Sequence, residues 1–248
     1  MTLTNSPAIL LRPVCTLFIS ALLFTGCQAP PPRELHGPAA ESTARELVPL
    51  PPLPVAGSTH YVVDRKESDV RILVFRGGPL AKVGHNHVVR VHDLSGDIYL
   101  SPQFHQSGFS LAFPVAALQV DPPEARADEG AEFAVMPSPQ AIDATYKNMT
   151  GPALLDAQQF PEITLRSVEM IGPEWGPEVT VRVTLRGVER DLIVPLAVHS
   201  DHGALTVTGT FSLQTSDFGM TPFSVLGGGL QVLDEVKIRA HIVAHRVN

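Results

Sequence analysis

Residues 178–187, EVTVRVTLRG, alternate without interruption between polar and apolar side chains. A period of two is that of a β-strand with one buried face, because successive side chains of a strand point to opposite sides. Residues 204–214, ALTVTGTFSLQ, repeat the pattern. Such a sheet must bury its apolar face, either by closing into a barrel or by stacking on a second sheet. Further strands are expected within residues 69–76, 107–118, 162–171, 191–200 and 235–245.

Short turns join the three central strands. GVERD, residues 187–191, and HSDHGA, residues 199–204, contain the glycine and polar residues that hairpin turns need. The strands they join are therefore expected to be antiparallel neighbours. The sequence predicts a mainly β domain built as a meander of long strands.

One segment, SPQAIDATYKNM, has the signals of a helix. Ser138 is placed to cap its amino end, and Pro139 would occupy the first helical position. Ile142, Tyr146 and Met149 then share one face. We expect this helix to act as a lid or plug at one end of the sheet, or else to lie on the surface between strands.

The amino terminus resembles a bacterial export signal. Arg12 precedes an apolar run that ends at Phe24, and this run is too short to span a membrane. The ending LFTGC resembles a lipobox, in which a lipid is attached to the cysteine, here Cys27, although Phe24 stands where leucine is usual. Because Gln28 follows the cysteine, we predict an outer-membrane lipoprotein that faces the periplasm. A soluble periplasmic protein with a cleaved signal is the alternative.

The predicted domains are a signal peptide at residues 1–26, a lipidated cysteine with a Pro/Ala-rich linker at residues 27–58, and one barrel domain at residues 59–248. Cleavage would remove one arginine and no acidic residue, which changes the net charge from −7 to −8. An acidic chain without a basic cluster argues against binding to nucleic acid. Membrane attachment would come from the lipid. The predicted domain has no cysteine, which excludes disulfides and cysteine nucleophiles.

Several segments, taken in order, resemble the YceI-like family of periplasmic lipid-binding proteins. They cover nearly all of residues 61–245, and the ordered set is more specific than any single segment. The family usually has Arg or Lys shortly before its Asp-Phe-Gly, where this chain has Thr215 and Ser216. The segments are YVVD (61–64), SDVRILVF (68–75), LDAQQFPEITLRS (155–167), LRGVERDLIVPLAV (185–198), SDFGM (216–220) and LDEVKIRA (233–240).

The resemblance implies a single lipocalin-like antiparallel β-barrel of about eight strands, with one or two short helices near one mouth. It also implies an elongated apolar interior that holds isoprenoid chains, including those of quinones. Eight strands are about the number whose interior can hold one small ligand. The alternative is that the inward side chains fill a dry core. The candidates for the inner wall are Phe109, Leu111, Phe113, Val181, Val183, Leu185, Leu196 and Phe211.

The run GHNH, residues 84–87, is not part of the common family pattern. In a strand, His85 and His87 would point to the same face, roughly 7 Å apart. They could contact the head group of a ligand, or serve as ordinary residues at the mouth of the barrel. They could also share a metal if a third ligand were supplied by His92, His241 or His245. Gly84 would let the chain turn sharply into the strand.

Two other segments are expected to be loops. The glycines at 227–229 lead into a strand and not into a helix, so they lack the geometry of a phosphate-binding loop. A charged segment is expected to be solvated, and it contains Asp121, Glu124, Arg126, Asp128 and Glu129.

The leading hypothesis is a lipid-anchored periplasmic protein that binds an isoprenoid or quinone-like molecule without chemistry and needs no cofactor. No motif of a hydrolase or metalloprotease accompanies the strands. The alternatives are a metal-binding protein or metalloenzyme that uses His85 and His87, and a structural or interaction lipoprotein whose barrel is filled.

Overall fold

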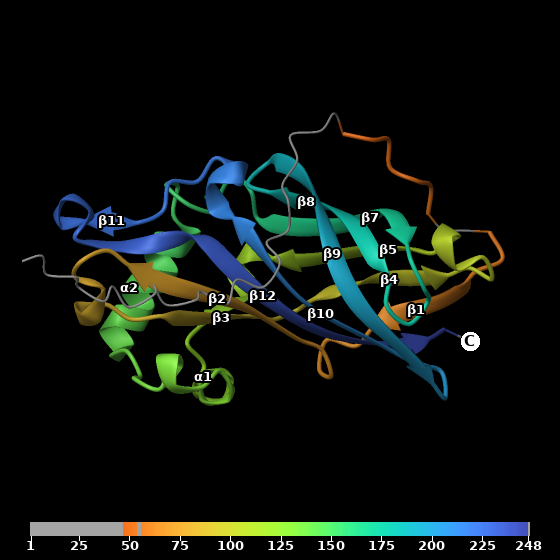
Figure 1. The fold of residues 1–248 in the computed structure, drawn as a ribbon, viewed down its shortest axis with the longest axis horizontal. Helices are drawn as coiled ribbons and strands as arrows, with labels where there is room; N and C mark the ends of the chain where they lie inside the picture. Colours follow the sequence, from red (N-terminus) through yellow and green to blue (C-terminus); the bar gives the residue numbers. More distant parts are fainter. Residues whose placement is uncertain (1–46, 54–55, 248) are drawn as a thin grey trace, which may run out of the picture. The chain divides into compact units, whose positions relative to one another are not determined.

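The computed structural model describes residues 47–53 and 56–247. The predicted signal peptide, Cys27 and most of the predicted linker therefore lie outside the described residues. The described part is mainly β, as expected, and two α-helices lie among its strands (Figure 1). No helix within these ranges is long and apolar enough to cross a membrane.

The strands and helices follow one another along the chain with short connections. The short 3-10 helices between them lie at Ala81–Val83, Phe104–Gln106, Val115–Ala117, Ala131–Phe133, Thr215–Phe218 and Leu226–Gly228. The strands and α-helices are β1 (Thr59–Val63), β2 (Asp69–Gly77), β3 (His87–Val91), β4 (Ser95–Leu100), β5 (Gly108–Pro114), β6 (Leu118–Val120), α1 (Pro123–Asp128), α2 (Pro139–Thr150), β7 (Glu162–Ile171), β8 (Glu178–Leu185), β9 (Val188–Asp201), β10 (Ala204–Gln214), β11 (Ser224–Val225) and β12 (Leu230–Arg246).

Eight strands close into an antiparallel barrel, which confirms the predicted fold. The ring runs β1-β4-β5-β7-β8-β9-β10-β12 and returns to β1, because β1 pairs with both β4 and β12. The two predicted hairpins are present and join β8 to β9 and β9 to β10. Gly187 and Gly203 have positive φ in these turns, a conformation that glycine adopts without strain.

The last strand, β12, closes the ring of the barrel, because it pairs with β10 on one side and with β1 on the other. It pairs with β10 along most of its length, with β1 near its carboxyl end, and with β2 between Gln231 and His241. From β2 the sheet continues through β3 to β6. At the end of the barrel away from β1, the wall is therefore built from β12, β2, β3 and β6. Helix α2 contacts β6 at this end.

Helix α2 begins as the sequence predicted. The Ser138 side chain accepts a hydrogen bond from the Ala141 N–H at 3.2 Å, and Pro139 follows it as the first helical residue. Ile142, Tyr146 and Met149 pack against the main core from this helix. The apolar stripe therefore attaches α2 to one end of the barrel.

Residues 47–53 contact the outer wall of the barrel. Arg182 of β8 donates to the Val48 carbonyl at 2.7 Å, and Arg166 of β7 donates to the Pro51 carbonyl at 2.9 Å. The Leu53 side chain lies against Gly108, where a Cβ would come within 2.8 Å of it. We call residues 47–53 the strap. Part of the predicted linker is thus hydrogen-bonded to β7 and β8.

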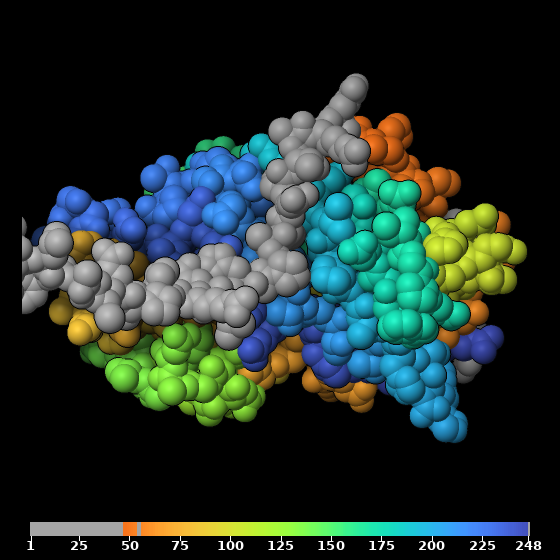
Figure 2. Space-filling view, viewed as in Figure 1, coloured from red at the N-terminus to blue at the C-terminus, as the bar shows by residue number. Residues whose placement is uncertain are grey.

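A second, smaller core lies outside the barrel. It contains Leu73 of β2, Val88 of β3, Ala125 of α1 and Phe133, with Phe75 packed against it. These strand residues pack against Ala125 of α1 and Phe133 of the turn after it, apart from the main core. Figure 2 shows the yellow-green segment that contains α1 lying beside the orange surface of the β2 region. The outer faces of β2 and β3 are consequently buried as well, which keeps the strand carrying His87 in place.

Candidate ligand-binding site

A cavity of about 400 Å³ lies at the end of the barrel where α2 packs. Its wall is apolar over most strands, and polar side chains lie on β2, β3 and the turn before it, α2, the 3-10 helix Thr215–Phe218 and β12. Such a volume falls within the range of small-molecule sites. The polar residues that line it are Arg76, His85, His87, Thr145, Asn148, Thr215 and Gln231.

A second cavity of about 130 Å³ lies beyond the first. Every residue that lines it is apolar, and most of these residues come from β2, β4, β5, β7, β8, β9, β10 and β12. Ile238 of β12 lines both cavities. The two cavities are therefore neighbours on either side of Ile238, and we call them the outer cavity and the deep cavity.

All eight residues predicted for the inner wall face these cavities. Leu185 lines the outer cavity. That the eight residues contact a ligand stays a prediction. The interior contains two cavities, so it differs from the alternative of a core filled by side chains. The deep cavity is lined by Phe109, Leu111, Phe113, Val181, Val183, Leu196 and Phe211.

Sequence reasoning missed part of the wall. Val236, Ile238 and Ile242 of β12 line the cavities, and the same alternation in EVKIRAHIVAH could have identified them. Met149 lines the outer cavity from α2, on the face that the sequence predicted to be apolar. Met220 lies after the Asp-Phe-Gly turn, in a segment without periodicity.

Both histidines of GHNH line the outer cavity. The strand begins only at His87, so His85 precedes it, and the two ring centroids are 6.4 Å apart. Within the described ranges, the one cluster of three potential metal ligands consists of Asp64, Glu67 and His245, and it includes neither of these histidines.

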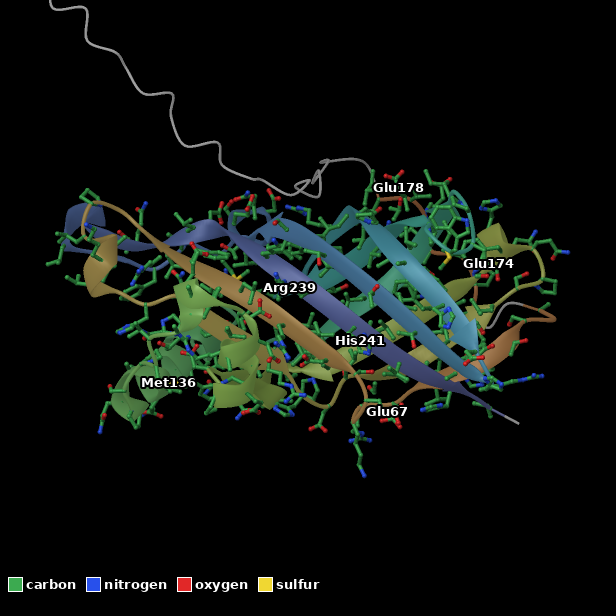
Figure 3. All side chains as sticks on the ribbon, turned by 60° about the horizontal axis from the view of Figure 1, so that its bottom comes forward. Glu67, Met136, Glu174, Glu178, Arg239 and His241 are labelled. Carbon is green, nitrogen blue, oxygen red and sulfur yellow. The ribbon has the colours of Figure 1, made fainter. Side chains whose placement is uncertain are left out.

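The other candidate metal ligands also lie elsewhere. His92 bonds to Gln119 at 2.6 Å. Arg239 and His241 project from the outer face of β12 (Figure 3). The histidines predicted as a third ligand are thus separated from the outer cavity, and no specific observation favours a metal site there.

His87 belongs to a buried ionic network. Its Nδ1 lies 2.6 Å from Asp121 Oδ2, and the other carboxylate oxygen accepts from the Val88 N–H at 2.9 Å and from Arg126. The Asp121 side chain is fully buried and that of Arg126 is 3% exposed. Burial raises the pKa of Asp121, but the hydrogen bonds from His87, Val88 and Arg126 outweigh it and hold the pKa below its ordinary value.

The expectation of a solvated charged loop is wrong for three of its five residues, while Glu124 and Asp128 are exposed as expected. Asp121, Arg126 and Glu129 have buried side chains, and Glu129 bridges Arg71 and Arg239 at 3.3 and 2.9 Å. The short helix α1 places Arg126 over the Phe133 ring. Sequence alone did not reveal this because the partners come from β2, β3 and β12, far along the chain.

The remaining residues of GHNH, Gly84 and Asn86, connect the turn before β3 to neighbouring segments. Asn86 is buried, accepts from the Arg76 N–H at 3.1 Å and donates to the Glu132 carbonyl at 3.3 Å. Gly84 has an ordinary negative φ, but a Cβ there would lie 2.7 Å from the Leu230 side chain. Its glycine is therefore explained by close packing against β12, and not by the sharp turn that was predicted.

Thr215 and Ser216 also have a defined role. Both hydroxyls donate to Asp234, at 2.7 and 2.5 Å, and the Ser216 N–H donates to it at 2.8 Å. Burial raises the pKa of Asp234, but these hydrogen bonds outweigh it and lower the pKa below its usual value. The two residues that replace the usual cation thus fix the turn at the rim of the outer cavity.

Comparisons with known proteins agree with this architecture. A model of the YceI-like domain matches residues 61–244. BcnA of Burkholderia cenocepacia superposes with a TM-score of 0.54 at 18% identity, covering 73% of this chain and 98% of that one. A polyisoprenoid binding domain from Saccharophagus degradans, implicated in plant cell wall breakdown, gives 0.50 at 12% identity, with 75% and 98% covered. At these identities the two structures support the fold alone. No curated protein matches the sequence at a significant level.

Proposed function

The chain belongs to the YceI-like domain family, and from this premise we propose that it binds a molecule with a long apolar chain, of the isoprenoid or quinone type, inside its barrel. The observation that carries the proposal is the pair of neighbouring cavities that share Ile238, the deeper one lined only by apolar residues. The structurally similar domain from Saccharophagus degradans is described as polyisoprenoid-binding, which supports the same ligand class.

The energetics fit a ligand with a chain and a small polar head. Moving ten carbons of a prenyl chain from water into the barrel releases about 8 kcal/mol before the costs of binding. Starting from a bilayer, most of this gain disappears, because lipid is already apolar. Selection among membrane molecules would therefore depend on the shape of the cavities and on polar contacts at the outer one.

We further propose that the protein carries or sequesters this ligand without chemistry. The polar side chains of the outer cavity are spread over several elements, and the ionic network behind His87 holds no nucleophile beside the ring. A binding role needs only the cavities and a few head-group contacts.

The test is to purify the full chain as it is produced and to extract it with organic solvent. Native mass spectrometry before and after denaturation should show an added mass that leaves as an apolar compound with a prenyl-type chain. A bare polypeptide that also fails to take up geranylgeraniol or a polyprenyl quinone would overturn the proposal. A mass that matches a metal ion would instead revive the alternative based on His85 and His87.

Anchoring to the outer membrane through Cys27 and a periplasmic location are proposals from the sequence. Mass analysis of the amino-terminal peptide should find a lipid on Cys27, and Cys27→Ser should move the protein from the membrane fraction to the soluble one. An unmodified Cys27, or a chain that still contains Arg12, would count against this anchor.

A further inference from the structure

Two nitrogens of the buried ionic network have no hydrogen-bond partner among the described residues, namely Arg126 Nε, which is enclosed, and His87 Nε2, which belongs to the ring that lines the outer cavity. Asp121 accepts from His87, from the Val88 N–H and from Arg126, and Arg126 also donates to the carbonyls of Asn86 and Val135. His87 uses only Nδ1 in this arrangement, and within the described residues no hydrogen bond is found for its Nε2. The His87 ring lines the outer cavity with its side chain 14% exposed.

The network fixes which ring nitrogen carries the proton. The Asp121 carboxylate only accepts hydrogen bonds, so the nitrogen 2.6 Å from it must donate. Arg126 already balances the charge of Asp121, and the cavity beside the ring is mostly apolar. We take the ring in its neutral form, with the single proton on Nδ1. Its Nε2 is then an acceptor that points to the ligand space.

We propose that His87 selects, among molecules with an apolar chain, those whose polar head carries a hydroxyl group. A prenyl alcohol or the reduced, hydroquinone form of a quinone can donate to Nε2, whereas a methyl ether or an oxidised quinone cannot. This inference rests on the proposed ligand class and adds the chemistry of its head. Asp121 acts through His87 and is a positioning residue.

A purely structural role does not account for the placement of the histidine. The loop before β3 is already secured by Arg126, which binds two carbonyl groups, and by Asn86. The amino end of β3 is secured by the bond from the Val88 N–H to Asp121. His87 is the member of the network that reaches the cavity, and its bond to Asp121 orients the ring there.

The test compares geranylgeraniol with its methyl ether, which have the same chain and differ in the ability to donate a hydrogen bond. The full chain should bind the alcohol about fivefold more tightly than the ether, the ratio that one net hydrogen bond supplies. In His87→Phe this ratio should fall to about one, and in His87→Gln, whose amide oxygen can accept, part of it should return. The control His92→Phe, on the outside of the barrel, should keep the fivefold ratio.

The outcomes separate this inference from the proposed function. If neither molecule binds, the proposed ligand class is wrong. If both bind equally to the unmodified protein, or if His87→Phe keeps the ratio, the function stands and the role of His87 is refuted. Asp121→Asn frees the ring to reverse its tautomer and should lower the ratio without abolishing binding.

The tautomer itself can be read without any ligand. In spectra of protein with 15N-labelled histidine, His87 should show a protonated Nδ1 and a bare Nε2. A proton on Nε2, in either the neutral or the charged ring, would overturn the inference even if Asp121→Asn fails to fold.

Discussion

A larger side chain in the deep cavity should stabilise the unliganded protein and weaken the binding of a ligand that reaches this cavity. Ala240 lies on β12 between Ile238 and Ile242 and lines this cavity with both of them. By strand alternation its Cβ points inward, while Arg239 and His241 point outward. The substitution Ala240→Leu would therefore extend the side chain by an isopropyl group into empty space.

The magnitude follows from the cavity volume. At ~24 cal/mol per Å³, an empty space of about 130 Å³ costs about 3 kcal/mol, which equals the burial of about four methylene groups. The leucine fills part of this space, so we expect the unliganded protein to gain about 1–2 kcal/mol of unfolding free energy. A ligand whose chain end occupies the deep cavity should lose a similar amount, about a tenfold rise in Kd.

Two measurements check this prediction. Urea denaturation of the unliganded protein gives the change in stability, and Kd values for prenyl alcohols of increasing chain length give the change in binding. Alcohols short enough to end at Ile238 should be little affected. Thr206→Leu, which lines neither cavity, is the matched control on the neighbouring strand β10.

Two results would refute the reasoning. A loss of stability greater than about 1 kcal/mol would mean that the deep cavity has no room for the leucine. An equal rise in Kd for short and long alcohols would mean that the chain end does not reach this cavity.

Three further predictions concern stability. Gly187→Ala should cost about 1–3 kcal/mol more than Gly203→Ala in denaturation experiments, because both glycines have positive φ but only a Cβ at 187 meets Phe160, at 2.6 Å. The pKa of Asp234 is lower in the folded protein than the ~3.9 of an unfolded chain, so its ionised carboxylate stabilises the fold above pH ~3.9. This stabilisation is lost as the pH falls through the pKa of the folded state. In Asp234→Asn, the unfolding free energy should therefore decrease less steeply with falling pH. A chain that begins after the strap should be about 1–3 kcal/mol less stable than one that begins at its first residue, since two arginine–carbonyl bonds are lost; equal stability would show that the strap contributes nothing.

The sequence was sufficient for those features that depend on neighbours along the chain. The alternation in β8 and β10 identifies inward side chains such as Val183 and Phe211, and Ser138 with Pro139 fixes the start of α2. The turn at Gly187 is equally local. In each case the signal and the structure it produces lie within about ten residues of each other.

Features that depend on distant partners were not predicted. Asp121 meets His87 from 34 residues away, so its charge suggested a solvated loop although its side chain is fully buried. The strap was assigned to the linker because Pro51 and its neighbours show no periodicity, yet Arg166 binds its carbonyl from 115 residues away. Main-chain carbonyls carry no sequence signal, and such contacts cannot be read from residue types.

The position of β12 as the last strand in the sequence has a consequence for the order of folding. This strand pairs with β1, β2 and β10, so it joins the first part of the domain to the last. Until residues 230–246 are available, β10 and β1 remain open sheet edges, and such edges can pair with other chains. Pairing over so long a sequence separation is slow. Closure of the ring is therefore a late event that depends on one strand, and the unclosed intermediate is the species most exposed to aggregation.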